Sequence, residues 1–247
     1  MNHFTFSACI AFPICLLAAV AGLLRRPGAK LNRIFAAHWF SIAFWAFFVG
    51  RQADLIQRLG AFWWGWFLHL GCVLIPTFFL HFAFAYSGET SRRKRVLTTA
   101  YVVSSAYLAL NLTTGLFTSG TAYRDAYAYP HPALLYPVYF VTFVASIMYG
   151  TLLMIRAGRT LDNGARRALW MYLIGHVLGY GGGMDNFLIM ADIRIVPLYP
   201  FGAYLIALYG AVAVFVVQRR RFLEAAPSVL PPLQVEQKSR QPEHALA

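Results

Sequence analysis

Two adjacent polar residues, Asp185 and Asn186, lie inside a long apolar stretch of the chain, residues 169–191. A lone ionised carboxylate is costly in a lipid-like environment, so it should face water, a polar partner or a ligand. His69 lies at a comparable depth, counted from the end of its own apolar stretch, and Tyr199 lies at the neighbouring rim. These four residues predict a ligand-binding pocket that is open to the outside of a membrane.

Glycines give the same stretch a second feature. Gly175, Gly179 and Gly183 repeat every four residues, so they share one stripe of a helix, where a neighbouring helix can approach closely. The glycine run at 181–183 also weakens a helix immediately before Asp185. Two interpretations follow. The stretch forms the wall of an outward-facing pocket, or it provides close helix packing with one polar residue that caps the outer turn.

Other chemistries find little support in the residue types. Retinal binding needs a buried lysine, but the three lysines all lie outside the last apolar stretch (Lys30, Lys94 and Lys238). Three histidines at similar depth could ligate a haem, but no spacing within one helix supports this (His38, His81 and His176). The three cysteines make no metal-ligand spacing. The sequence therefore predicts no catalytic residue, no metal site and no cofactor.

Seven apolar stretches position these residues, and each is about long enough to cross a bilayer, which takes roughly 20 mostly apolar residues. The chain is 59% hydrophobic and 12% charged, and its mean hydropathy is +0.56. In lipid, backbone groups must bond within their own segment, so each stretch is predicted to be a helix. The predicted fold is all-α, a polytopic seven-transmembrane-helix bundle in one domain, residues 1–224. Its helices are expected at residues 4–24, 31–50, 61–86, 96–113, 134–156, 169–191 and 198–217.

Lysine and arginine residues sort to alternate connections between these stretches. Of the 21, 17 lie on one side of the predicted membrane and 4 on the other (Arg51, Arg58, Arg124 and Arg194). Because positive residues stay in the cytoplasm, we expect an exterior amino terminus and a cytoplasmic carboxyl terminus. The net charge of +12 then reflects topology and contact with anionic lipid heads. The basic residues are dispersed over four loops, so no nucleic-acid partner is expected.

Two further segments carry predictions. Residues 114–133 form the largest exterior loop, which is rich in tyrosine and holds Pro130 and Pro132. This loop is either an interfacial aromatic belt or a lid over an outward-facing pocket. Residues 225–247 are rich in proline and polar residues, and such a composition predicts a disordered cytoplasmic tail.

Two runs of residues carry a family resemblance. The run IPTFFLHFAFAYSG, followed by the basic SRRKR turn, resembles the seven-span amino-terminal sensor region of bacterial membrane histidine kinases. The run from Gly181 to Phe222 is similar to the same family, with Asn186, Pro197, the Tyr-Pro-Phe-Gly sequence at 199–202 and a basic exit at 219–222. The resemblance covers residues 4–224 and implies a receptor module whose last helix leads to a cytoplasmic output. No output domain follows Glu224, so the chain is either a stand-alone sensor with a partner or a fragment.

We therefore expect a multi-pass protein of the bacterial inner membrane, without catalytic activity. It should bind an external or membrane-borne small ligand and signal through a cytoplasmic kinase or cyclase partner. Two alternatives stay open, a small-molecule permease and a structural subunit of a membrane complex. A permease would move solute across vesicles, and a structural subunit would co-purify with its complex at a fixed ratio.

Overall fold

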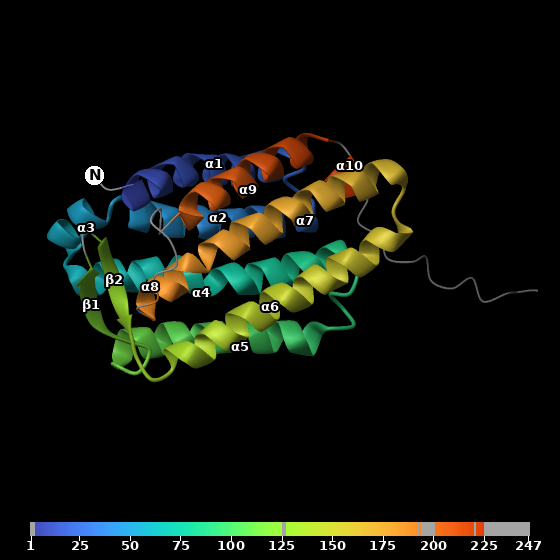
Figure 1. Ribbon diagram of the computed structural model, residues 1–247. Coiled ribbons are helices and arrows are strands. Elements are labelled where there is room, and N and C mark those ends of the chain that lie inside the picture. The colour runs from blue at the N-terminus through green and yellow to red at the C-terminus, as the bar shows by residue number, and fades with distance from the viewer. Residues whose placement is uncertain (1–2, 125–126, 192, 194–200, 220, 225–247) are drawn as a thin grey trace, which may run out of the picture.

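The computed structural model describes residues 3–124, 127–191, 193, 201–219 and 221–224. Long helices run side by side through an elongated bundle (Figure 1). Each of the seven predicted apolar stretches overlaps one of them: α1 (His3–Arg25), α2 (Lys30–Gly50), α4 (Ala61–Tyr86), α5 (Lys94–Thr113), α6 (Tyr136–Ala157), α7 (Asn163–Gly183) and α9 (Gly202–Gln218). The predicted helix at 169–191 differs most, because α7 begins earlier and ends at Gly183. The prediction of an all-α bundle is confirmed.

Five helices within the described residues are long and apolar enough to cross a membrane, namely α1, α2, α4, α5 and α6, the last extended to Thr160. The helix α9 is apolar but has only 17 residues. The helix α7 is long enough, but its glycines, His176 and the two arginines near its start lower its mean hydropathy. Length therefore separates α9 from the five spans, whereas composition separates α7 from them.

Several short elements supplement the long helices. They are α3 (Gln52–Leu59), β1 (Thr118–Arg124), β2 (Tyr127–Pro132), the 3-10 turn η1 (Gly158–Thr160), α8 (Asp185–Met190) and α10 (Arg221–Glu224). The two strands form an antiparallel hairpin, in which Thr121 pairs with Pro130 and Tyr123 pairs with Ala128. The sequence predicted this segment as a loop and gave no signal for the pairing.

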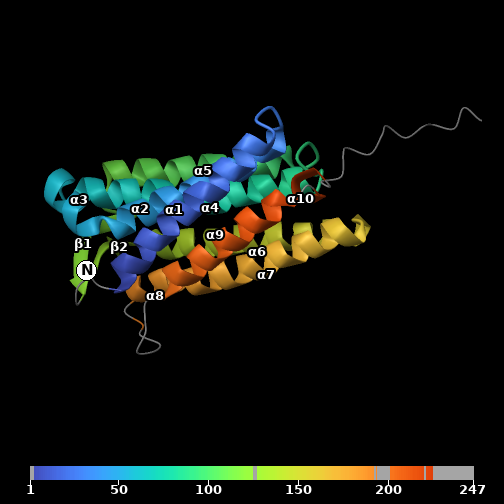
Figure 2. The ribbon, with the colours of Figure 1, turned by 90° about the horizontal axis from the view of Figure 1, so that it is seen from above.

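The helices pack as two groups, which meet where α2 lies against α4. One group holds α1, α2, α7 and α9, and the other holds α4, α5 and α6. The helix α1 lies between α2 and α9, and α7 lies along α9 (Figures 1 and 2). The helix α4 lies against α2, α5 and α6. Large rings fill the interior between the groups, including Trp39, Trp64, Phe79, Tyr139 and Tyr172, all fully buried. The outward faces carry exposed apolar side chains, as expected for helices that lipid surrounds.

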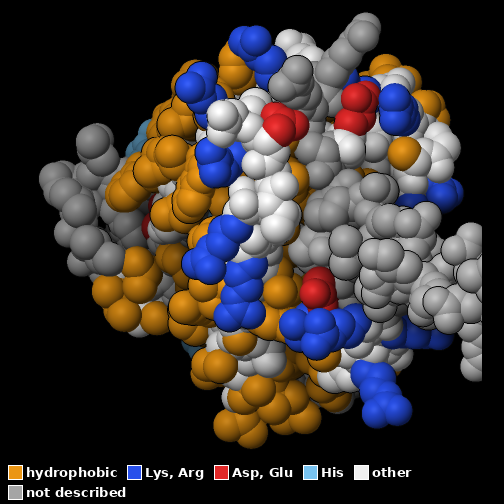
Figure 3. Space-filling view, turned by 90° about the vertical axis from the view of Figure 1, so that its right-hand side faces the viewer, with side chains coloured by type: hydrophobic (Ala, Val, Ile, Leu, Met, Phe, Trp, Pro, Cys, Tyr) orange, Lys and Arg blue, Asp and Glu red, His pale blue; other side chains and the backbone are white. Residues whose placement is uncertain are grey.

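The two ends of the bundle differ in charge. Lysine and arginine side chains gather at the end opposite the hairpin, and Figure 3 views the bundle from that side. They come from the helix ends that meet there, such as Arg25 of α1, Lys30 of α2, Arg156 of α6 and Arg167 of α7. We call this the basic end, and we call the other end, with β1, β2 and α3, the hairpin end.

Two parts of the sequence prediction fall outside the described residues. One is the tail at 225–247, and the other is Tyr199 together with Pro197 in the segment before α9.

Candidate functional site

A cavity of about 90 Å³ lies inside the bundle toward the hairpin end. Its walls come from α2, α4, α6, α7, α8, α9 and strand β2, and α1 and α3 each contribute one residue, Phe4 and Gln52. Most lining side chains are apolar, and they include Ile42, Trp45, Val49, Leu68, Ile75, Phe143, Met184, Phe187 and Ile206. Such a cavity, mostly apolar with a few polar groups, is the usual form of a small-molecule site.

The polar groups of the cavity are few and uncharged. Gln52 and Asn186 are the amides, and Tyr180 and Tyr209 are among the hydroxyl-bearing residues. No lysine, arginine, histidine, aspartate or glutamate is among the lining residues that the structure describes. The cavity is therefore suited to an uncharged guest.

The hairpin forms one wall of the cavity and is fastened to the helices beside it. Four β2 residues line the cavity: Tyr127, Ala128, Tyr129 and Pro130. The Tyr127 hydroxyl lies 3.1 Å from Nε2 of His3, and its ring meets Phe4 edge-on at 5.4 Å between centroids. The Thr121 hydroxyl donates to the Ala61 carbonyl at 3.4 Å. These contacts favour the lid among the two interpretations of the 114–133 loop.

The glycine stripe of α7 faces α9. A Cβ atom added at Gly175 would lie 3.2 Å from Val212, and one at Gly179 would lie 2.7 Å from Tyr209. At Gly183 the corresponding distance to Ile206 is 3.4 Å. The missing side chains allow the two backbones to approach closely. Gly179 and Gly183 also line the cavity, so the same stripe brings α9 into its wall.

Asp185 holds the start of α9. The helix interruption falls at Met184, directly after the glycine run, and Asp185 opens α8. Its carboxylate is only 4% exposed and accepts a hydrogen bond from the backbone N–H of Gly202, the first residue of α9, at 2.5 Å. A carboxylate at a helix amino terminus satisfies a free N–H group and complements the helix dipole.

The structure brings only some of the four predicted pocket residues together. Asn186 lines the cavity, and its amide donates to Asp185 at 3.0 Å. Asp185 lies beside it but does not line the cavity. His69 is fully buried, its Nδ1 lies 2.9 Å from the Gly65 carbonyl, and it is outside the lining as well. Tyr199 lies outside the described residues.

Sequence reasoning missed the residues that define the two ends of the cavity. Gln52 is the first residue of α3 at the hairpin end, while Tyr180 belongs to α7 and Tyr209 to α9. Tyrosine is common at membrane interfaces, so the sequence offered no signal to distinguish these tyrosines from anchoring ones. The hairpin tyrosines were noted, but their position over the cavity depends on the unpredicted strand pairing.

A chain of aromatic contacts leads from the cavity toward the basic end. The Tyr209 hydroxyl donates to the Tyr172 hydroxyl at 2.7 Å and lies 3.3 Å from Nδ1 of His176. The Tyr172 ring in turn lies 5.0 Å from the Phe222 ring of α10. Phe222 is fully buried. Tyr209 at the cavity is thus linked to α10 through its contact with Tyr172 and the contact of Tyr172 with Phe222.

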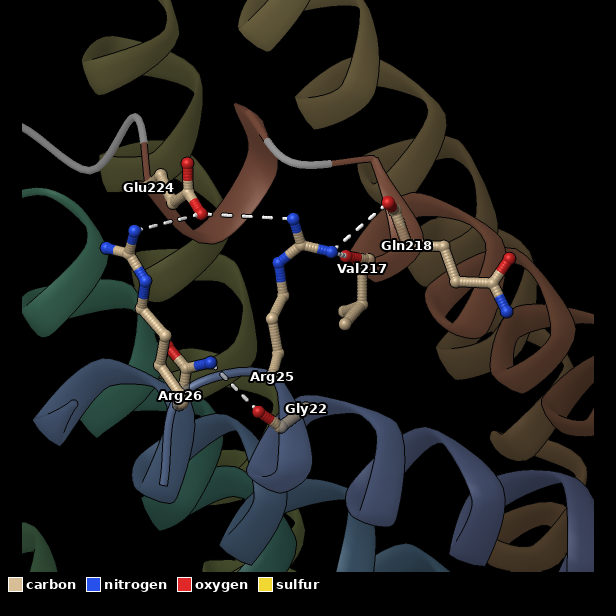
Figure 4. Close-up of polar contacts among 7 residues, drawn as sticks. Gly22, Arg25, Arg26, Val217, Gln218 and Glu224 are labelled. Carbon is tan, nitrogen blue, oxygen red and sulfur yellow. Dashed lines mark hydrogen bonds and ion pairs between the residues drawn. The ribbon is translucent and has the colours of Figure 1, made fainter. Parts of the chain in front are cut away.

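At the basic end, Arg25 of α1 holds the end of α9 (Figure 4). Its guanidinium donates to the carbonyls of Val217 and Gln218 at 2.8 and 3.1 Å. Glu224 of α10 lies 3.8 Å from Arg25 and 3.4 Å from Arg26. We call Arg25, Arg26, Phe222 and Glu224 the exit cluster, because they fix α10 where the chain leaves α9.

The fold and the cavity together define a class: a multi-pass membrane protein whose helices surround a mostly apolar cavity near one end. The chain belongs to the family described as the N-terminal 7TM region of histidine kinase, which matches residues 4–227. No curated protein and no solved structure matches it significantly. The family makes this region a membrane sensor module in signalling, and a region of this kind has no catalytic domain of its own.

Proposed function

We propose that this sensor module binds a small ligand in the cavity beneath the hairpin and passes the binding event along α9 to a cytoplasmic partner. The observation that carries the proposal is the composition of the cavity wall. The hairpin covers it on one side, and α9 contributes Ile206 and Tyr209 on another. A guest in the cavity therefore touches both the lid and the helix that leads to the exit cluster.

The proposed orientation places the hairpin end outside and the basic end in the cytoplasm of the inner membrane. The gathering of lysine and arginine at one end supports it, since positive residues are retained in the cytoplasm. Reporter fusions at Lys238 and in the loop around Gly120 test this orientation. We expect the two fusions to report opposite compartments. A common compartment would contradict the seven-span arrangement.

The proposed output is a change at the exit cluster. Tyr209, Tyr172 and Phe222 form a continuous series of contacts between the cavity and α10. A ligand can shift an equilibrium only by its different affinity for two states, so the guest must favour one position of α9. The partner that reads this position is a cytoplasmic kinase or cyclase, in keeping with the family.

Filling the cavity without a ligand tests the link to α10. Ile206→Phe adds volume at the cavity wall, whereas Leu208→Phe adds the same ring type on the same helix at a side chain that is 47% exposed. We expect Ile206→Phe to change hydrogen exchange of the α10 amides at least threefold in lipid nanodiscs. Leu208→Phe should leave it unchanged. If both variants exchange like the wild type, the cavity is not coupled to the exit.

A further inference from the structure

We propose that the ligand is an uncharged, elongated amphiphile, whose head group donates a hydrogen bond to Gln52 and whose apolar chain lies along α2 toward Ile42. This inference rests on the proposed function, because it assigns a chemical class to the ligand of the same cavity. Three features of the described residues carry it: the missing charge, an unpaired amide oxygen and the length of the apolar wall.

The described lining of the cavity carries no charge, which argues against an ionic head group. No lysine, arginine, aspartate or glutamate is among the described residues that line the cavity. The charged residues next to Gln52 in the sequence are paired with one another. Asp54 lies 2.8 Å from Arg51 and 2.7 Å from Arg58. An ionic group moved from water into this apolar site would lose its hydration without gaining a partner.

Gln52 supplies the polar contact. Its side chain amide is buried, with the residue only 4% exposed, and its Nε2 donates to the Thr5 hydroxyl at 3.3 Å. Its Oε1 is enclosed and finds no hydrogen-bond partner within the described part of the chain. An unpaired buried carbonyl carries a desolvation cost, which a donor on the ligand removes. A hydroxyl or an amide N–H meets this need, whereas a carboxylate or a sulfate cannot donate.

The apolar wall sets the shape of the ligand. From Val49 to Ile42 the lining follows α2 over seven residues, which corresponds to about 10 Å of helix, and Gln52 lies beyond this wall at the start of α3. Trp45 lies between Val49 and Ile42, and Leu68 and Ile75 of α4 also line the cavity. The Tyr180 hydroxyl is also enclosed and unpaired among the residues described, so a carbonyl or hydroxyl along the chain gains a second hydrogen bond.

Tryptophan quenching in nanodiscs tests the class, because Trp45 and Trp64 line the cavity and bromine quenches on contact. The probes are 12-bromododecan-1-ol, 1-bromododecane and 12-bromododecyl sulfate, used with the full chain. The signal of the Ile206→Phe variant gives the background from lipid-facing tryptophans. We expect part of the tryptophan quenching by the alcohol to saturate. The sulfate should bind at least tenfold more weakly.

Gln52→Leu tests the head-group contact. We expect it to weaken binding of the alcohol roughly five- to tenfold, since a typical hydrogen bond is lost, and to leave bromododecane unchanged. Equal binding of the alcohol and bromododecane by the wild type would overturn this contact, whether or not the variant folds. Tighter or equal binding of the sulfate would overturn the uncharged class while the proposed site stands. If no probe gives saturable quenching that is lost in Ile206→Phe, the cavity is not a ligand site and the proposed function fails with it.

Discussion

The two ends of the bundle hold α9 in opposite ways. At the hairpin end, α9 starts on the buried carboxylate of Asp185 and then runs along an uncharged, mostly apolar cavity. At the basic end, Arg25 binds the last carbonyls of α9, and an enclosed ring and ion pairs hold α10. A space that can be filled lies at one end, and directional contacts that can be broken lie at the other. The proposed function, in which α9 reports occupancy of the cavity, depends on this difference.

The largest expected effect lies at the basic end. Phe222→Ala removes a fully buried ring that packs on Tyr172 and Tyr86. Buried Phe→Ala changes cost about 3–5 kcal/mol, and a cost of about 3 kcal/mol corresponds to a roughly hundredfold faster opening of α10. Hydrogen exchange of the α10 amides measures it. Phe215→Ala, which truncates an exposed ring of α9, is the matched control. Equal exchange in the two variants would show that Phe222 does not hold α10.

The next effect concerns the seam that α7 and α9 share between the two ends. Gly179→Leu places a side chain against Tyr209, and overpacking of this kind costs about 1–3 kcal/mol. Gly181→Leu is the matched control, because nothing lies within 4 Å of a Cβ atom at Gly181. We expect the first variant to melt clearly below the wild type and the second to melt close to it. Equal melting temperatures for both variants would mean that the seam tolerates bulk.

A smaller effect separates the two arginines of the exit cluster. Arg25→Gln removes a cation that hydrogen-bonds the end of α9, a contact worth roughly 1–2 kcal/mol at a partly buried helix carboxyl terminus. Arg26→Gln removes only a mainly exposed ion pair, which contributes about 0–1 kcal/mol. Thermal unfolding in nanodiscs compares them. An equal or larger loss for Arg26→Gln would contradict the assignment of Arg25 as the residue that holds α9.

The smallest effect belongs to the exposed charges of α3 at the hairpin end. Hydrogen bonds from Arg58 and Arg51 hold the pKa of Asp54 below its ordinary value. Since the folded-state pKa is lowered, any stabilisation by Asp54 is present at neutral pH and is lost only as the pH falls through the acid range. Asp54→Asn should therefore change the melting temperature at pH 7 less than Arg25→Gln does, and this change should become smaller as the pH falls through the acid range. A decrease in melting temperature at pH 7 as large as that of Arg25→Gln would show that the charges of α3 contribute substantially to the stability of the bundle.

The sequence predicted the helices well because its signal is local. Each apolar stretch extends over roughly the length of one membrane-crossing helix, and the glycine repeat of α7 follows the helical period. The interruption at Met184 also follows from the glycine run before it. These features depend on residues close together in the chain, so no tertiary information is needed to find them.

The cavity was harder to predict because its residues meet only through tertiary packing. Gln52, Tyr180 and Tyr209 come from three distant segments, and nothing in their spacing indicates a common site. Asp185 attracted attention as a deep carboxylate, but the structure uses it to hold the first N–H of α9. His69 was predicted from its depth along the apolar stretch, but depth along a helix does not specify the direction that a side chain faces.

The central claim is that occupancy of the cavity changes the exit cluster, and ligand-dependent hydrogen exchange tests it most directly. The α10 amides are followed in nanodiscs while 12-bromododecan-1-ol is titrated into the wild-type protein and into Ile206→Phe. We predict a saturable change of at least threefold in the wild type, with the same midpoint as the tryptophan quenching, and no change in the variant. Saturable quenching without any change in hydrogen exchange of α10 would contradict the claim, because the cavity would then bind its guest without any effect on the exit cluster.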